Sequence, residues 1–168
     1  MAKKLSIPLA LGLALLMGAL WGCAQKVKIS EKKDRKTIVA SDSLLAGMIS
    51  SLLPSPGYEV TFILPPTQCP GHYDVKLSDI EKLKKADLVV SFVGMPYMEK
   101  ADIDARRSLY IDAGGHNWMA PDSYIQGLNY LARELAARFP EQQTEISRRL
   151  QAAIRKTEEE AAALKKRL

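Results

Sequence analysis

The chain alternates short apolar runs with amphipathic segments from about residue 37 to residue 139. The run 37–41 is interpreted as a buried strand, and the continuous apolar run 87–93 is typical of a strand covered on both faces of a sheet. The segments between the runs repeat apolar residues every three or four positions, which predicts helices. Strands are expected at 37–41, 58–64, 87–93 and 108–112. Helices are expected at 44–53, 78–86 and 121–139, with 94–107 irregular or weakly helical.

Capping residues mark the starts of these helices. Asp42 or Ser43 can cap the first helix, because either side chain can accept a hydrogen bond from a free backbone N–H. Ser78 followed by Glu81 has the spacing of a capping box. Pro121 suits the first turn of the third helix. The alternating order of strands and helices predicts an α/β fold with a mostly parallel sheet flanked by helices.

A long helix is expected at the end of the chain. Pro140 breaks the preceding helix, and residues 141–168 contain no glycine or proline. At about 1.5 Å per residue this segment would extend roughly 42 Å, more than one small lobe needs. An apolar stripe follows one face: Ile146, Leu150, Ala153, Thr157, Ala161, Leu164 and Leu168. The part from about Ile154 onward is expected either to fray in a monomer or to pair with another chain.

The first residues have the layout of a secretory signal. Lys3 and Lys4 precede an uncharged apolar stretch that runs to Gly22. The following Leu20-Trp21-Gly22-Cys23 resembles a bacterial lipobox, in which the cysteine thiol receives a diacylglyceryl group. Trp21 departs from the usual small residue, so an uncleaved anchor is the alternative. Either way, the folded part is expected to be exported and anchored to the membrane, at the periplasm or the cell surface.

Charge and domain organisation add further limits. Removal of residues 1–22 deletes two lysines and lowers the formal net charge from +5 to +3. Aromatic residues do not alternate with basic ones, so nucleic acid is not expected as a partner. The short basic tether can touch anionic lipid headgroups. The predicted divisions are a leader at 1–22, a tether at 23–36, an α/β lobe at 37–139 and a long helix at 140–168.

The two histidines of the chain each lie in a glycine-flanked loop after a predicted strand. His72 lies in Cys69-Pro70-Gly71-His72-Tyr73-Asp74, and His116 lies in Gly114-Gly115-His116-Asn117-Trp118. Loops at the carboxyl ends of parallel strands share one edge of the sheet, where ligands bind. Neutral imidazole is the commonest metal ligand in proteins. The pattern suggests a metal site, the alternative being two turn histidines with no joint role.

Several neighbouring residues are candidates for the same site. Cys69 is either a third ligand or a small buried thiol, and with Cys23 lipidated it could form no disulfide within the chain. Asp74 is either a ligand or a carboxylate that caps a turn or hydrogen-bonds to a ligand. Asp112 is expected to orient His116 by accepting its other ring proton, or to cap a turn. Tyr73 and Trp118 are expected to form the walls of the site.

Two blocks of the sequence resemble the zinc/manganese solute-binding proteins of ABC transporters. The first block comprises Ile63-Leu64-Pro65-Pro66, Gly71-His72-Tyr73-Asp74, Ser78-Asp79-Ile80 and Ala86-Asp87-Leu88-Val89-Val90. The second is His116-Asn117-Trp118-Met119-Ala120-Pro121, which opens a helix. The blocks occur in the family's order and spacing, and the resemblance extends from about Thr37 to the end of the chain.

The resemblance implies a fold and a ligand. In this family two α/β lobes are joined by a long backbone helix, and Zn²⁺ or Mn²⁺ binds in the cleft between the lobes. The N-terminal lobe supplies two histidines, which match His72 and His116 here. The C-terminal lobe supplies further ligands, and residues 141–168 match the backbone helix. The chain is therefore expected to be limited to the N-terminal lobe and that helix, with the metal site completed by a second chain or by local residues.

The expected function is a non-enzymatic, membrane-anchored metal-binding component that delivers metal to the permease and ATPase of an importer. One alternative is an interaction or structural lipoprotein, or a remnant, that has lost transport. Another is a hydrolase using Cys69 as nucleophile and His72 as base. The sequence offers no motif for the oriented third group or the oxyanion hole that such an enzyme needs.

Overall fold

Four parallel strands form the sheet, in the order β2-β1-β3-β4. The computed structural model describes residues 35–99, 101–116 and 118–167, all within the unit Lys33–Leu168. The predicted leader, the lipidation residue Cys23 and most of the tether lie outside the described residues. The strands are β1 (Lys36–Asp42), β2 (Tyr58–Leu64), β3 (Leu88–Phe92) and β4 (Ser108–Ile111). The predicted parallel α/β sheet is confirmed.

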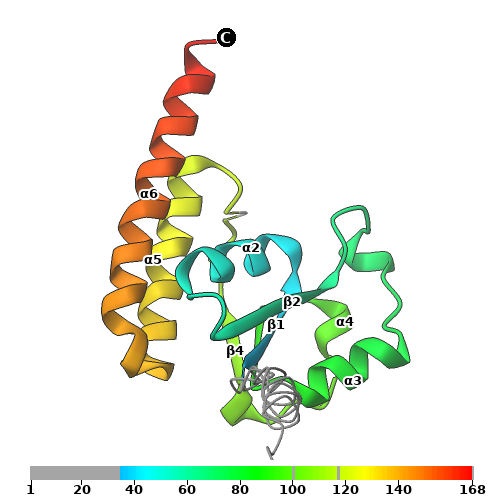
Figure 1. Cartoon of the computed structure of the whole chain (residues 1–168). Coiled ribbons are helices and arrows are strands. Elements are labelled where there is room, and N and C mark those ends of the chain that lie inside the picture. The colour runs from blue at the N-terminus through cyan, green and yellow to red at the C-terminus, as the bar shows by residue number, and fades with distance from the viewer. Residues whose placement is uncertain (1–34, 100, 117, 168) are drawn as a thin grey trace, which may run out of the picture. The chain divides into compact units, whose positions relative to one another are not determined.

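Helices cover both faces of the sheet (Figure 1). One face carries α2 (Ser43–Leu52), α5 (Pro121–Arg138) and α6 (Gln143–Lys165). The other carries α3 (Leu77–Lys85) and the short α4 (Pro96–Glu99). Three short 3-10 helices are η1 (Pro70–His72), η2 (Ala105–Arg107) and η3 (Pro140–Gln142). No helix among the described residues combines the length and the apolar character that crossing a bilayer requires.

The inner strands explain the continuous apolar runs of the sequence. In β1, Ile38 and Ala40 face the α2–α5–α6 side, and Val39 faces the α3–α4 side. All three side chains are fully buried. Full burial of a side chain as large as Ile38 or Val39 contributes about 1.5–3 kcal/mol to folding. A strand between two helical layers therefore needs apolar residues at successive positions, and not at alternate ones.

The connections create a topological switch point in the sheet. From β1 the chain crosses to β2 on one side, and β3 and β4 then follow on the other side. At their carboxyl ends, β1 and β3 are therefore followed by connections that leave in opposite directions. A crevice lies between these two connections. In open α/β sheets this crevice is where ligands bind.

The structure corrects the predicted start of α3. The helix begins at Leu77, and the Ser78–Glu81 capping box is wrong. Instead the Asp79 carboxylate accepts a hydrogen bond from the Lys76 backbone N–H at 3.1 Å. Asp79 is buried and also accepts a bond from the Tyr73 hydroxyl. A contact from the preceding loop thus decides which residue caps the helix. The cap predicted for α2 is confirmed, because Asp42 accepts from the Leu45 N–H.

The long terminal helix packs on the lobe for only part of its length. It follows the η3 turn, so α6 begins at Gln143 and not at residue 141. Ile146 is buried against α5, and Leu150, Ala153 and Ile154 pack on the same core. Beyond Ile154, of the residues described, only Thr157 and Ala161 are half-buried and the others are exposed. Figure 1 shows this distal part of α6 extending past α5 and α2.

Candidate metal centre

The two histidine loops leave the same edge of the sheet. β2 and β4 are the outer strands and run parallel, so the loops that follow them both start at the carboxyl edge (Figure 1). Three interstrand spacings, about 14 Å in all, separate these two strands. An ion shared by His72 and His116 therefore requires both loops to lean over the ends of β1 and β3, above the switch point.

The first loop presents exposed side chains on a short helical turn. Pro70 begins η1 and His72 ends it, with the His72 N–H donating to the Cys69 carbonyl at 3.1 Å. Cys69, His72 and Asp74 are all exposed. The prediction that Cys69 could be a small buried thiol is wrong, since it is a free, exposed cysteine. Its side chain and the His72 imidazole are both accessible to an ion from solvent.

Tyr73 anchors this loop to the lobe. Its hydroxyl donates to the Asp79 carboxylate at 2.8 Å, and its ring packs edge to face on Tyr97 at a centroid distance of 5.6 Å. The Tyr97 hydroxyl in turn donates to the Ser41 carbonyl at the end of β1. Burial and the Asp79 carboxylate raise the pKa of Tyr73 to about 12, so its hydroxyl remains a donor at neutral pH. This chain of contacts ties the residue after His72 to the central strand.

The second loop needs an unusual backbone. Gly114 and Gly115 have φ angles of +56° and +77°, a region that glycine enters without steric cost. The Asp112 carboxylate accepts from the Gly114 N–H at 2.8 Å, and the His116 N–H donates to the Ala113 carbonyl at 2.9 Å. Asp112 thus holds the turn that carries His116. Its predicted role of orienting the imidazole stays a prediction.

Trp118 fixes the end of this loop in the core. It has a φ of +51°, is only 5 % exposed, and its ring lies 5.1 Å from that of Phe92. The indole also lies directly against Gly127 of α5, with no room for a side chain there. A non-glycine residue with positive φ costs about 1 kcal/mol or more, so packing must hold it in place. His116, two positions earlier, is exposed on a loop with a buried anchor.

Three residues that support the loops were not singled out from the sequence: Asp79, Tyr97 and Gly127. An acidic residue in the first turn of a helix is a capping signal that could have indicated Asp79. A lone glycine inside an amphipathic helix is a signal of close packing that could have indicated Gly127. Tyr97 lies in α4, within the segment predicted as irregular or weakly helical, where periodicity gives little signal.

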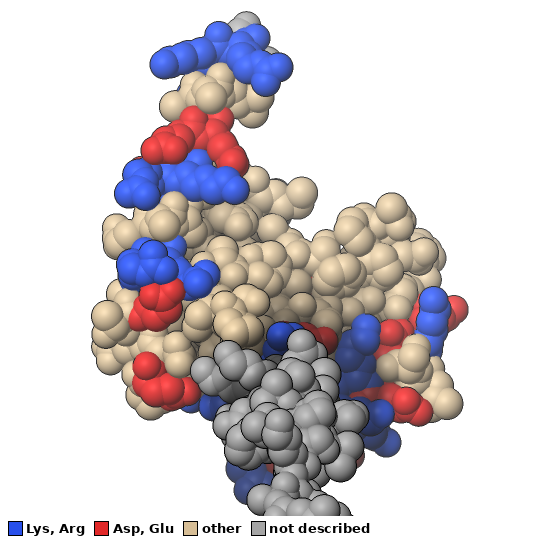
Figure 2. Space-filling model, in the orientation of Figure 1, with Lys and Arg blue, Asp and Glu red and all other residues tan. Residues whose placement is uncertain are grey.

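The described part of the lobe does not assemble a full set of metal ligands. Among the described residues, no group of three or more His, Cys, Asp or Glu side chains lies close enough to hold an ion. Figure 2 shows that the surface between the distal part of α6 and the loop after β2 is uncharged in this view. A closed zinc site takes four ligands in a tetrahedron. The lobe alone therefore offers at most a partial site.

The sequence of residues 38–168 matches the family described as zinc-uptake complex component A, periplasmic (ZnuA). The chain belongs to this family. The ZnuA family consists of binding components of metal uptake and not of enzymes, which removes the hydrolase alternative. The recognition of this family from the two histidine blocks is confirmed. No curated protein matches the chain.

Solved structures confirm the fold of the ZnuA family for this chain. A crystal structure of ZnuA superposes with a TM-score of 0.64 at 19% identity, over 75% of this chain and 56% of that one. Zn(II)-bound AdcA from Streptococcus pneumoniae gives 0.63 at 17%, over 74% and 31%. An Mn-bound periplasmic metal-binding protein from Candidatus Liberibacter asiaticus gives 0.62 at 14%, over 73% and 53%. The chain spans about half the length, or less, of these proteins.

Proposed function

We propose that this chain is an extracytoplasmic metal-binding component of an ABC importer for zinc or manganese. The observation that carries the proposal is the family match over residues 38–168, which includes both histidine loops. The exposure of His72 and His116 at one edge of the sheet supports it, because a ligand that captures an ion must be accessible. The partners would be the permease and the ATPase of the importer, as for solute-binding components in general.

The ligand class follows from the donor types at this edge. Imidazole and thiolate are nitrogen and sulfur ligands, which suit zinc better than magnesium. With His72 and His116 as ligands and Cys69 or Asp74 as a further donor, the lobe would hold zinc weakly. A second chain would complete the coordination shell.

A metal titration of the intact chain tests this function. The full chain in non-ionic detergent is titrated with zinc, manganese and magnesium and measured by mass spectrometry under native conditions. We expect zinc and manganese complexes at concentrations where magnesium forms none. Binding of all three ions with equal affinity would show non-specific association with surface carboxylates and would contradict the proposal.

Replacing Cys69 tests its role as a ligand. We expect Cys69→Ser to weaken zinc binding more than manganese binding, because thiolate prefers the softer ion. Calorimetric titration with each metal measures the two losses, and Gln68→Ser, the exposed neighbour in the same loop, is the control. If Cys69→Ser lowers the affinity for both metals equally, Cys69 has a structural role only.

Anchoring through Cys23 is a separate part of the proposal. We expect Cys23→Ser to leave an unprocessed precursor that incorporates no labelled fatty acid, because the thiol is the atom that is acylated. Cys69→Ser should be labelled and processed normally, since it retains the acceptor cysteine. Normal processing of the Cys23→Ser chain would instead make the leader an ordinary signal or an uncleaved anchor.

A further inference from the structure

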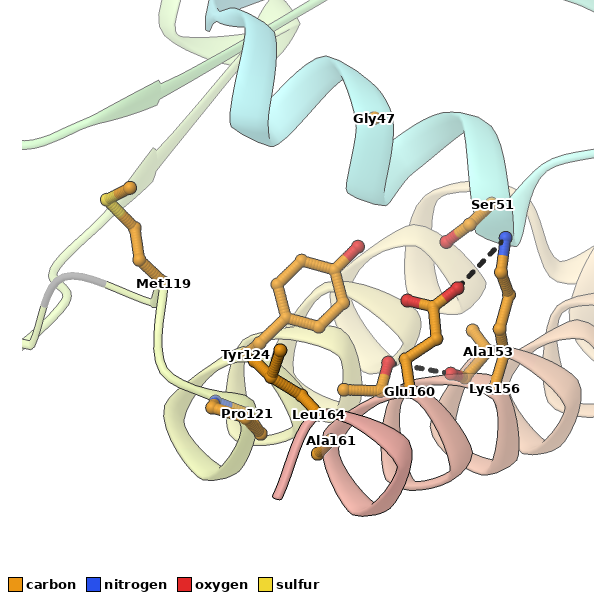
Figure 3. A pocket seen from close by; sticks show the side chains of 11 residues that line it. Gly47, Ser51, Met119, Pro121, Tyr124, Ala153, Lys156, Glu160, Ala161 and Leu164 are labelled. Atoms are coloured by element: carbon orange, nitrogen blue, oxygen red, sulfur yellow. Dashed lines mark hydrogen bonds and ion pairs between the residues drawn. The ribbon is translucent and has the colours of Figure 1, made fainter. Parts of the chain in front are cut away.

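The distal part of α6 lines an open groove on the lobe. Its lining includes Thr157, Ala161 and Leu164 of α6 and the Lys156–Glu160 ion pair of the same helix. Gly47 and Ser51 of α2 and Tyr124 of α5 are among the residues that line the other side (Figure 3). The groove has a volume of about 530 Å³. Leu164 is 59 % exposed, and a Cβ added at Gly47 would meet no atom within 4 Å. An apolar helix face beside a groove of this size is a typical docking surface for another helix.

Charges are ordered along the same part of the helix. Glu158, Glu159 and Glu160 precede the uncharged stretch 161–164, and Lys165, Lys166 and Arg167 follow it. Figure 2 shows the resulting bands on the protruding end of α6, acidic then uncharged then basic. Within the described residues, no ion pair involves Lys165, Lys166 or Arg167. The basic band is therefore available to an acidic partner.

Helical geometry places these charges on both sides of the apolar stripe. At about 100° per residue, Glu158 and Lys165 lie on one flank of the Thr157–Ala161–Leu164 stripe. Glu160 and Arg167 lie on the other flank. Glu159 and Lys166 lie on the opposite face of the helix, away from the stripe. The pattern is symmetric about the midpoint between residues 162 and 163, with acids and bases exchanged.

This symmetry identifies one partner. When a second α6 lies antiparallel across that midpoint, Ala161 of one copy faces Leu164 of the other. Glu158 then faces Lys165 of the second copy, and Glu160 faces Arg167 of the second copy. A parallel copy would place like charges together, which destabilises such a pair. Because α6 protrudes, the two lobes would lie at opposite ends of the paired segment.

We propose that two copies of this chain associate through antiparallel contact of their distal α6 segments, residues 157–167, seated in the groove beside α2 and α5. The contact is short and belongs to the weak class of interfaces, below about 1,200 Å². Charge complementarity therefore provides orientation and specificity more than affinity. The association does not depend on metal binding.

Charge reversal with mixing tests the proposed dimer. The full chain in non-ionic detergent is followed by sedimentation velocity over a range of concentrations. We expect a concentration-dependent dimer for the wild type. Glu160→Lys alone and Arg167→Glu alone should each weaken it by about tenfold or more, because each places two like-charge contacts in the dimer. An equimolar mixture of the two variants should restore a heterodimer, which added salt weakens.

The opposite face of α6 supplies matched controls. Glu159 and Glu160 each pair with a cation one turn earlier, Arg155 at 3.9 Å and Lys156 at 3.8 Å. Glu159→Lys therefore makes the same charge change as Glu160→Lys and loses an equivalent ion pair within the helix. Lys166→Glu is the corresponding control for Arg167→Glu. Both controls should dimerise as the wild type does. The mixing experiment also distinguishes a lost contact from misfolding, because a misfolded variant would not form the heterodimer.

Three outcomes would overturn the proposal. The first is a wild-type chain that stays monomeric at every concentration. The second is equal weakening of the dimer by Glu159→Lys and Glu160→Lys, or no heterodimer when Glu160→Lys and Arg167→Glu are mixed. The third is strong hydrogen-exchange protection of residues 157–167 in a proven monomer, which would show that the chain's own residues cover the groove.

Discussion

Replacing either His72 or His116 with alanine should abolish measurable zinc binding by this chain. Each histidine would supply one of only two imidazoles, and the described residues offer no group of three donors that could compensate. Loss of a residue that hydrogen-bonds to a metal ligand already lowers metal affinity by about 10–100-fold. Loss of the ligand itself should therefore lower the affinity further. Calorimetric titration of the intact chain with zinc measures the effect.

The control for the histidine variants lies in the same loop. Gln68 is exposed and offers no strong metal donor, so Gln68→Ala should retain wild-type affinity. If either histidine variant binds zinc as tightly as the wild type does, the two loops do not share an ion. The parallel sheet would then hold two unrelated turn histidines at its edge, as the sequence alone already allowed.

Replacing Gly127 with alanine should destabilise the fold, although alanine is the better helix former. A Cβ at this position would lie 2.6 Å from two indole carbons of Trp118 and 2.8 Å from the terminal methyl of Met48. Overpacking of this kind costs about 1–3 kcal/mol, and helix propensity returns only about 1 kcal/mol. The net loss is then about 0–2 kcal/mol, and we expect about 1 kcal/mol, measured by urea unfolding.

Gly47→Ala is the matched control for that change. Gly47 is also inside a helix, but a Cβ there would meet no atom within 4 Å. This variant should gain about 0.5–1 kcal/mol, so the two changes should have opposite signs. Gly127→Ala should also weaken zinc binding, because displacement of Trp118 moves the loop that carries His116. Equal stability of Gly127→Ala and the wild type would show that the indole is not tightly held.

Much of the candidate site was accessible from local sequence. The glycines before His116 predicted a loop, and in the structure both have positive φ. Each histidine follows a predicted strand. Because the strands were predicted to be parallel, both histidines were expected at one edge of the sheet, where the structure has their loops. The supports of the loops were not accessible in this way. Local signals mark Asp79 and Gly127 themselves, but the Tyr73–Asp79 bond and the Trp118–Gly127 contact depend on where the following helix packs, which those signals do not specify.

By itself, the sequence determined the strands, most helix ends to within one residue, the parallel α/β class and the membership in the ZnuA family. These follow from local causes, because burial between two layers requires continuous apolar runs and caps act on adjacent backbone groups. Only the tertiary structure decided the strand order, the cap of α3 by Asp79, the burial of Trp118 and the groove beside α6. The strand order, the burial of Trp118 and the groove depend on contacts between residues distant in the chain, whose energy depends on how whole elements pack against one another. The Asp79 cap is local, but its partner Tyr73 is held by the distant ring of Tyr97.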